Sequence, residues 1–409
     1  MKYHKLIITS FICILCFAIT ILIWNIKKTP DSVEVLKDNL GENEIIDFEK
    51  FENESLKIAT LYKDLYIKSE KNESDYIQYD FILNQDDIDN IENFLISKEY
   101  PVINSDEKYP EYLENANIFY NFWNKVSIGE NADQNVIFIH PNGSMLYMIL
   151  KQYDNIKYRI GITVEWDDKN EPYVYDTEYC EITEWDLVDN TNFYYMTHRV
   201  GPMYDDYILI RLKEVDKKLY DLNAKYILPI GYVYNNMFIC DWSYKDYGML
   251  CFNDLLEGLY MVRNNKYFNI EEYPKVTEPY TYSYIPSSLF ESTIMPYFDI
   301  SLQEFRKKCL YDKELDIYPW QEICNVNFAS YPSVEPEVIS YKENEDGTII
   351  LTVNARCNDF KTTCLFSHEV TIRQFEDGTY HYLGNKVIYK SEYELPTSEP
   401  RLPMQRTKL

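Results

Sequence analysis

The chain has 409 residues, of which 46% are hydrophobic and 16% aromatic, so it is too apolar to be disordered and long enough for two domains. Its formal net charge of −27 at pH 7 repels nucleic-acid phosphates, and we therefore exclude nucleic-acid binding. Nine cysteines are present, and because Cys13 and Cys16 lie in an N-terminal apolar run, an odd number remains for the rest of the chain. That odd number argues against a disulfide framework.

The N-terminal apolar run covers residues 6–24, LIITSFICILCFAITILIW, and contains no charge, Pro or Gly. As a helix it spans about 28 Å, close to the ~30 Å hydrocarbon core of a bilayer. Lys2 and Lys5 precede it and Lys27 and Lys28 follow it, so the positive-inside rule alone is nearly balanced. A short basic leader favours a cytoplasmic N-terminus and an extracytoplasmic bulk. We predict an uncleaved membrane anchor, with signal-peptide removal or lipidation as the alternatives.

After the anchor, placed at 1–28, comes an acidic stretch at 29–80 that we interpret as a juxtamembrane stalk with a helix from 45 to 69. The next domain is predicted at 81–272. Its first helix follows Asn84, a typical N-cap residue. Alternating apolar and polar residues later in this domain predict an antiparallel meander sheet. The domain is therefore expected to be of the α+β class.

The prolines at 273–285 predict a linker to a second α+β domain at 286–395. Capping boxes at Ser288 and Ser301 predict two helices at its start. Four antiparallel strands follow, at 337–343, 348–357, 364–374 and 379–389. Two helices over a curved four-stranded sheet resemble the plan of cystatin-like and NTF2-like domains. The basic, Pro-containing tail at 396–409 is expected to fold back onto the surface or to be disordered, with a docking peptide as the alternative.

Two copies of the tetrapeptide EDGT, at 345–348 and 376–379, predict three-residue hairpin loops with Gly in the left-handed position. These loops fix the predicted pairs Tyr341 with Leu351, Ile339 with Val353, Leu351 with Val370, Ile349 with Ile372, Ala355 with Phe366 and Ile372 with Tyr382. The same register places Cys357 opposite Cys364, within disulfide distance. This pair is a candidate disulfide in an oxidising compartment.

Three stretches of the sequence are similar to those of a known family: DISLQEFRKKCLYDKELDIYPWQEIC at 299–324, EPEVISYKENEDGTIILTV at 335–353 and HEVTIRQFEDGTYHYLGN at 368–385. They resemble an uncharacterised family of membrane-anchored, extracytoplasmic proteins from low-GC Gram-positive bacteria. The resemblance implies a location and a source. It implies no activity and no functional residues.

His368 and Glu369 match the start of a zinc-protease motif, but Ile372 stands where that motif needs its second histidine. Four residues of strand separate Cys364 from His368 by about 13 Å, too far to share one ion. We predict no metal and no cofactor. On the predicted register His368 faces the core, either as a hydrogen-bonded buried histidine or as a residue that lines a pocket in the cone.

These observations favour a non-catalytic, membrane-anchored protein that binds a partner protein or a cell-envelope component, and we expect no enzyme. One alternative is an envelope hydrolase that uses paired carboxylates. Its candidate residues form two acidic groups, Glu165 with Asp167 and Asp168, and Glu181 with Glu184 and Asp186. The other alternative is a small-ligand sensor that relays through another membrane protein.

Overall fold

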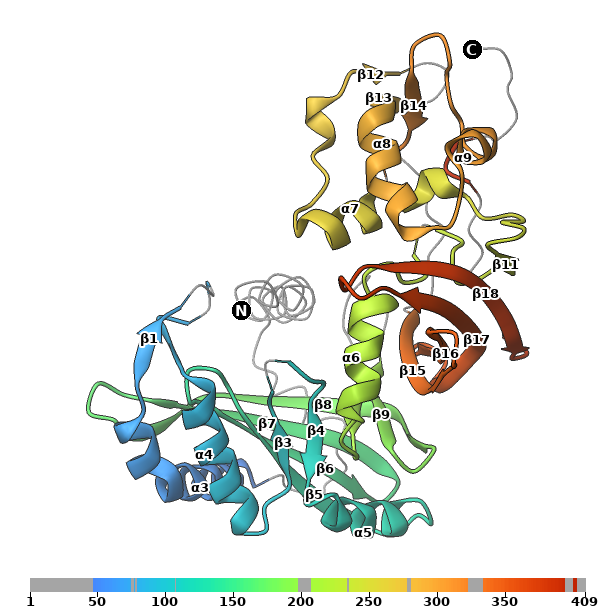
Figure 1. Ribbon diagram of the computed structural model, residues 1–409. Coiled ribbons are helices and arrows are strands. Elements are labelled where there is room, and N and C mark those ends of the chain that lie inside the picture. The colour runs from blue at the N-terminus through green and yellow to red at the C-terminus, as the bar shows by residue number, and fades with distance from the viewer. Residues whose placement is uncertain are drawn as a thin grey trace. The chain divides into compact units, whose positions relative to one another are not determined.

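The computed structural model describes residues 47–402, except 75–76, 78, 107, 198–206, 234, 278–280, 323–333 and 394–399. The predicted anchor and most of the tail lie outside the described residues. Among those described, no helix combines the length and the apolar character needed to cross a membrane. The chain divides into two compact units, 1–215 and 216–409. Both combine helices with mainly antiparallel sheets, which confirms the predicted α+β class (Figure 1).

The first unit consists of a large sheet with helices on it (Figure 1). Its helices are α3 (Phe48–Lys68), α4 (Gln85–Ser97) and α5 (Ala116–Val126). Its strands are β1 (Lys71–Glu73), β2 (Phe81–Leu83), β3 (Val102–Asn104), β4 (Tyr112–Glu114), β5 (Ala132–Ile139), β6 (Met145–Tyr153), β7 (Ile156–Trp166), β8 (Pro172–Val188), β9 (Asn192–Thr197) and β10 (Tyr207–Arg211). Eight of them form a sheet in the order β10-β9-β8-β7-β6-β5-β3-β4, antiparallel except where β3 pairs with β5.

The helices of this unit pack against opposite faces of the sheet. Leu95 of α4 and Tyr62 of α3 share one buried cluster with Ile137 of β5. On the other face, Phe122 of α5 shares a second cluster with Val136. Neighbouring residues of β5 thus serve different cores, because successive side chains of a strand point to opposite faces. Both faces of the central strands are buried.

Part of the predicted stalk belongs to this core. Tyr62 and Tyr66 of α3 are only 0% and 2% exposed, and the ring of Tyr66 stacks on Trp166 with centroids 4.3 Å apart. The predicted helix is confirmed, but its interpretation as a stalk was wrong. The charged side chains of α3 lie mainly on its exposed face, while the opposite face packs on the sheet.

Two of the predicted helix starts are confirmed. The side chain of Asn84 caps α4 and the side chain of Ser301 caps α9, each by accepting from the backbone N–H three residues later. The capping box predicted at Ser288 was wrong, because Ser288 lies inside α8, which begins at Ser287 after Pro286 and has no side-chain cap. Pro286 supplies a fixed φ before the first turn instead.

The second unit contains a five-stranded and a three-stranded sheet, ordered β11-β18-β17-β16-β15 and β12-β13-β14 (Figure 1). Its helices are α6 (Lys217–Tyr226), α7 (Leu256–Asn264), α8 (Ser287–Ile294) and α9 (Leu302–Lys308). Its strands are β11 (Trp242–Ser243), β12 (Lys275–Val276), β13 (Tyr282–Pro286), β14 (Ile317–Trp320), β15 (Val334–Glu343), β16 (Thr348–Cys357), β17 (Thr362–Gln374) and β18 (Tyr380–Lys390).

The predicted boundary between the domains was wrong. The units meet after residue 215, so residues 216–272 belong to the second unit and not to a domain at 81–272. The hydroxyl of Tyr382 in β18 donates to the carbonyl of Tyr226 in α6 at 2.6 Å, and β11 extends the sheet beside β18. The predicted linker at 273–285 contains β12 and most of β13. These contacts join segments far apart in sequence, which local composition does not reveal.

The four predicted strands of the second unit are confirmed as β15 to β18, and both EDGT loops place Gly347 and Gly378 at φ +77° and +84°. The confirmed pairs are Tyr341 with Leu351, Leu351 with Val370, Ile349 with Ile372, Ala355 with Phe366 and Ile372 with Tyr382. Val353 faces Val338 and not Ile339, because the register shifts between Val338 and Ser340. A bulge thus displaces the start of β15 by one residue.

Candidate functional site

His368 lies in the middle of β17 and is fully buried. Its Nδ1 lies 2.7 Å from Oδ1 of Asn385, and its Nε2 lies 2.8 Å from the hydroxyl of Tyr232. Burial lowers the pKa of His368 to about 4, so the imidazole is neutral at pH 7. Nδ1–H then donates to Asn385, and Tyr232 donates to Nε2. Both ring nitrogens are paired within the core, and His368 lines neither of the hollows described below.

The predicted opposition of Cys357 and Cys364 was wrong. The register of β16 and β17 shifts between Ala355 and Cys357, and Cys357 faces Thr362. Both cysteines are free thiols in the structure. The shift lies within the ladder, where the step from Ala355 to Cys357 in β16 runs beside the longer step from Phe366 to Thr362 in β17. This irregularity in the paired strands moves Cys357 out of the register that the apolar alternation predicted.

Three of the carboxylates proposed for an envelope hydrolase have separate local partners. Glu165 accepts from the hydroxyl of Tyr173 at 3.0 Å. Asp167 accepts from the backbone N–H groups of Lys169 and Glu171, which lower its pKa. Glu184, farther along β8, accepts from the hydroxyl of a tyrosine in β10. None of the six candidates lines either of the hollows described below.

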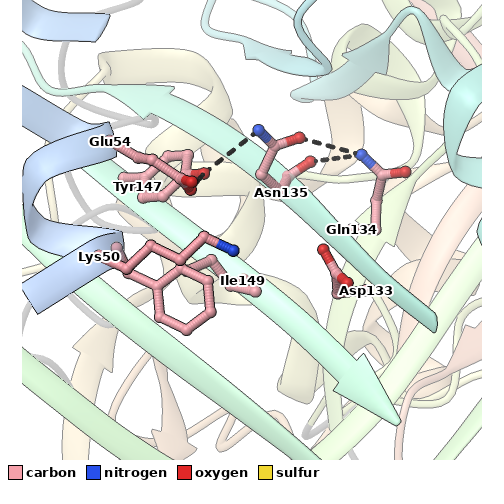
Figure 2. Close-up of a pocket in the computed structure, with 8 residues that line it drawn as sticks. Lys50, Glu54, Asp133, Gln134, Asn135, Tyr147 and Ile149 are labelled. Carbon is pink, nitrogen blue, oxygen red and sulfur yellow. Dashed lines mark hydrogen bonds between the residues drawn. The ribbon is translucent and has the colours of Figure 1, made fainter. Parts of the chain in front are cut away.

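A hollow of about 190 Å³ opens between α3 and strands β5 and β6 (Figure 2). We call it the α3 hollow, and its lining residues are Lys50, Phe51, Glu54, Asp133, Gln134, Asn135, Tyr147 and Ile149. α3 supplies the charged residues on one side, and the first half of β5 supplies a carboxylate and two amides on the other. The hollow is formed by segments that are about 80 residues apart in the chain.

A chain of hydrogen bonds runs along this hollow (Figure 2). The hydroxyl of Tyr147 lies 3.4 Å from Oε2 of Glu54, and Nδ2 of Asn135 lies 3.4 Å from that hydroxyl. Nε2 of Gln134 donates to Oδ1 of Asn135 at 3.1 Å. Burial raises the pKa of Tyr147 to about 12, so its hydroxyl remains a donor at pH 7. In Figure 2 the Lys50 side chain extends from α3 towards β5.

A second hollow, of about 360 Å³, lies beside α5. We call it the α5 hollow, and its lining residues are Ile118, Asn121, Phe122, Lys125, Asn131, Ala132, Asp133 and Gln134. It shares Asp133 and Gln134 with the α3 hollow. Apolar side chains make up a larger part of its lining than of the lining of the α3 hollow. The start of β5 is therefore flanked by two hollows of different chemistry.

The two hollows are suited to hold polar and amphipathic groups. Amides and a neutral tyrosine hydroxyl offer both donors and acceptors, and aromatic rings offer flat apolar faces. Within the described ranges, His, Cys, Asp and Glu side chains form no cluster that could hold a metal ion. The arrangement can therefore hold a peptide side chain or a small polar ligand by hydrogen bonds and contact.

From the sequence, the apolar alternation predicts a strand at 136–140, and that start left the residues of this site outside the strand. The structure begins β5 at Ala132, so the polar residues 133–135 are part of the strand. Three consecutive polar residues at the start of an apolar strand are the signal that could have found it. Their role depends on α3 and α5, and no sequence pattern indicated that these helices would flank the strand.

Comparisons with known proteins identify the chain at the level of a family. No curated protein matches the chain, and no solved structure matches it. The family of unknown function DUF6070 matches residues 48–401, which begin at the first residue of α3 and cover most of both units. The predicted resemblance to an uncharacterised family is confirmed to this extent. The chain belongs to the family of unknown function DUF6070.

Proposed function

We propose that this protein is a non-catalytic binding protein, which holds a partner protein or a cell-envelope component through the hollows of the first unit. The observation that carries this proposal is the pair of hollows that share Asp133 and Gln134 at the start of β5. A ligand there would contact groups from three elements at once. Such convergence of polar groups around a concave surface is typical of binding sites.

The charges around the α3 hollow support recognition of a polar ligand. Lys50 and Asp133 are exposed, while Glu54 is half-buried and bonded to Tyr147. The neutral hydroxyl of Tyr147 and the amide of Asn135 line the same hollow. A ligand could exchange water at the charged rim for these fixed donors and acceptors, with little rearrangement of the fold.

The proposed location follows from the sequence. The apolar run at 6–24 supports a single membrane anchor with a cytoplasmic N-terminus and extracytoplasmic units. The resemblance stated above supports the envelope of a Gram-positive bacterium. For the second unit we keep the proposal of a cystatin-like or NTF2-like plan, supported by α8 and α9 preceding the four strands β15 to β18.

A thermal-shift titration tests the proposed binding. Full-length protein in detergent would be titrated with cell-wall peptides, wall-derived sugars and Ca²⁺, alongside the variant Asn135→Ala. We expect at least one wall-derived ligand to raise the melting temperature of the wild type in a saturable way. The same ligand should shift Asn135→Ala much less.

The matched control is Asn90→Ala, which changes an exposed amide of α4 outside both hollows, and Asn121→Ala tests the α5 hollow in the same way. Equal shifts in wild type, Asn135→Ala and Asn121→Ala would place the ligand outside both hollows and contradict the proposal. A saturable shift with a small sugar alone would favour the sensor alternative over a protein partner.

A further inference from the structure

The first half of β5 has an open edge. β6 pairs with β5 along residues 132–139 on one side. On the other side β3 pairs only with Ile137 and Phe138. In the part of the chain that the structure describes, no strand pairs with residues 132–135 on that side. An unpaired edge of this kind offers backbone N–H and C=O groups to another strand.

One hydrogen bond shows which backbone groups point to this edge. The N–H of Ile137 donates to the carbonyl of Pro101 at 2.9 Å, on the side of β3. In a strand, alternate residues direct their N–H and C=O groups to the same edge. The N–H groups of Asp133 and Asn135 therefore point to the open edge, while Gln134 and Val136 pair with β6.

The two hollows lie on the two faces beside this edge. The odd-numbered Ile137 and Ile139 belong to the core on the α3 side, and Val136 belongs to the core on the α5 side. A strand added to β5 would point successive side chains to opposite faces. One side chain would reach the α3 hollow and the next the α5 hollow. Backbone pairing with pockets for alternate side chains is the geometry of strand addition.

Gln134 covers part of the edge. Its side chain starts from the α5 face, yet Nε2 donates to the backbone carbonyl of Asn135 at 2.9 Å and to its Oδ1 at 3.1 Å. Asn135 lies on the α3 face, so the two amides meet around the edge of the strand, as Figure 2 shows. An added strand would replace the amide of Gln134 at this carbonyl.

Charge indicates which side chain would enter the α3 hollow. Two carboxylates, Glu54 and Asp133, line it against one ammonium group, Lys50. The whole chain carries a net charge of −27. A basic side chain would pair with the carboxylates and approach along a favourable field. Most residues that line the α5 hollow are polar, but Ile118 and Phe122 form an apolar patch in it that an apolar side chain would contact.

We propose that an extended segment of a partner protein adds as a strand to the open edge of β5 at residues 132–135. It places a Lys or Arg side chain in the α3 hollow and an apolar side chain in the α5 hollow. This inference rests on the proposed function and names the partner's chemistry: an extended peptide with alternating basic and apolar residues.

The probe is a fluorescein-labelled peptide of sequence VKVKVKV, with a second copy methylated on every backbone nitrogen. Binding to the full-length protein in detergent is measured by fluorescence anisotropy. The methylated copy keeps the charges and side chains but cannot donate to a strand. We expect it to bind about tenfold more weakly. Equal affinity for the two peptides would overturn strand addition.

Two substitutions at one position separate pairing from charge. Asp133→Pro removes an N–H that points away from β6, so the β5–β6 ladder is kept. Asp133→Asn removes the charge and keeps the N–H. We expect Asp133→Pro to weaken the probe about tenfold and Asp133→Asn about threefold. Equal affinities of the two variants would show that charge alone binds the probe and would overturn the proposal.

A third variant keeps the test decisive if Asp133→Pro does not fold. Gln134→Ala removes the amide that occupies the carbonyl of Asn135, and we expect it to bind the probe about threefold more tightly. Unchanged or weaker binding would count against the proposal. If wall ligands shift the melting temperature of the wild type and the probe still fails to bind, strand addition fails and the proposed function stands.

Discussion

In the second unit, the buried groups of His368 and Arg401 are paired within the fold, whereas in the first unit the hydrogen-bond chain from Glu54 to Gln134 lines an open hollow. The side chain of Arg401 is 4% exposed and is held by the carboxylates of Asp254 and Glu257. The first unit combines two aliphatic and aromatic cores with polar residues at one strand edge.

The difference shows that polar groups inside a fold can have two roles, which are to fix the packing or to contact a ligand. Where every donor and acceptor has a partner in the fold, the network specifies one packing and leaves nothing for a ligand. Where amides and a hydroxyl line a hollow that opens to solvent, their hydrogen bonds can be exchanged with a ligand at low cost. We therefore expect substitutions in the second unit to change stability and those at β5 to change binding.

The largest loss of stability is expected for Arg401→Met. Its guanidinium donates to Glu257 at 2.8 Å and to the carbonyl of Gln321 at 3.1 Å, beside the buried Asp254. Without Arg401 a buried carboxylate loses its cation, at a cost of roughly 3 kcal/mol. The loss should be smaller at pH 5, where Asp254 can take up a proton. Urea unfolding at both pH values measures it.

The exposed Lys386 in β18 offers a control, because Lys386→Met also replaces a positively charged side chain by methionine, but at the surface. It should change the free energy of unfolding by less than about 0.5 kcal/mol. Similar losses in the two variants would mean that Arg401 contributes only surface charge.

A smaller, pH-dependent effect is expected for Glu92→Gln in α4. Burial raises the pKa of Glu92 to about 8, although Ser105 donates to its carboxylate. The folded state therefore binds a proton that the unfolded chain releases near pH 4.5. Stability falls as the pH rises from about 4.5 to about 8. Glu92→Gln should flatten this dependence and stabilise the unit by roughly 2 kcal/mol at pH 8.

Amide hydrogen exchange in α4 at pH 6 and pH 8 checks this, with Glu49→Gln on the exposed face of α3 as the control. A pH dependence that persists in Glu92→Gln would assign the titration to another group.

Tyr232→Phe should cost about 1 kcal/mol, because it leaves Nε2 of the buried His368 without a donor. The wild type should also lose stability as the pH falls from about 6.5 to about 4. In this range His368 binds a proton in the unfolded chain but stays neutral in the folded protein. Chemical unfolding of the second unit measures both. The exposed Tyr267 supplies the control Tyr267→Phe, and an equal loss there would contradict a special role for the buried pair.

The smallest effect on stability is expected at the α3 hollow. Tyr147→Phe removes two hydrogen bonds of 3.4 Å and should change the free energy of unfolding by less than about 1 kcal/mol. It should nevertheless weaken binding of any ligand of the α3 hollow more than Tyr175→Phe on β8. A large loss of stability with unchanged binding would reverse the contrast between the two units.

The sequence by itself determined those features that follow from local rules. The cap at Asn84, the left-handed glycines Gly347 and Gly378, and the pairing of Leu351 with Val370 were all predictable, because caps, tight loops and period-two alternation involve neighbouring residues. The predicted registers were correct up to two irregularities in the ladders, one near Ile339 and one between Ala355 and Cys357.

Only the tertiary structure decided which segments share a core and where a site opens. α3 joined the sheet and was not a stalk, residues 216–272 joined the second unit, and Arg401 was drawn from a basic tail into a buried ion pair. The hollows at β5 likewise depend on α3 and α5, which flank polar residues that the sequence left outside any strand. Such contacts form between segments that are far apart in the chain, so they depend on the closure of long loops. The composition of either segment alone does not indicate how strongly the two will interact.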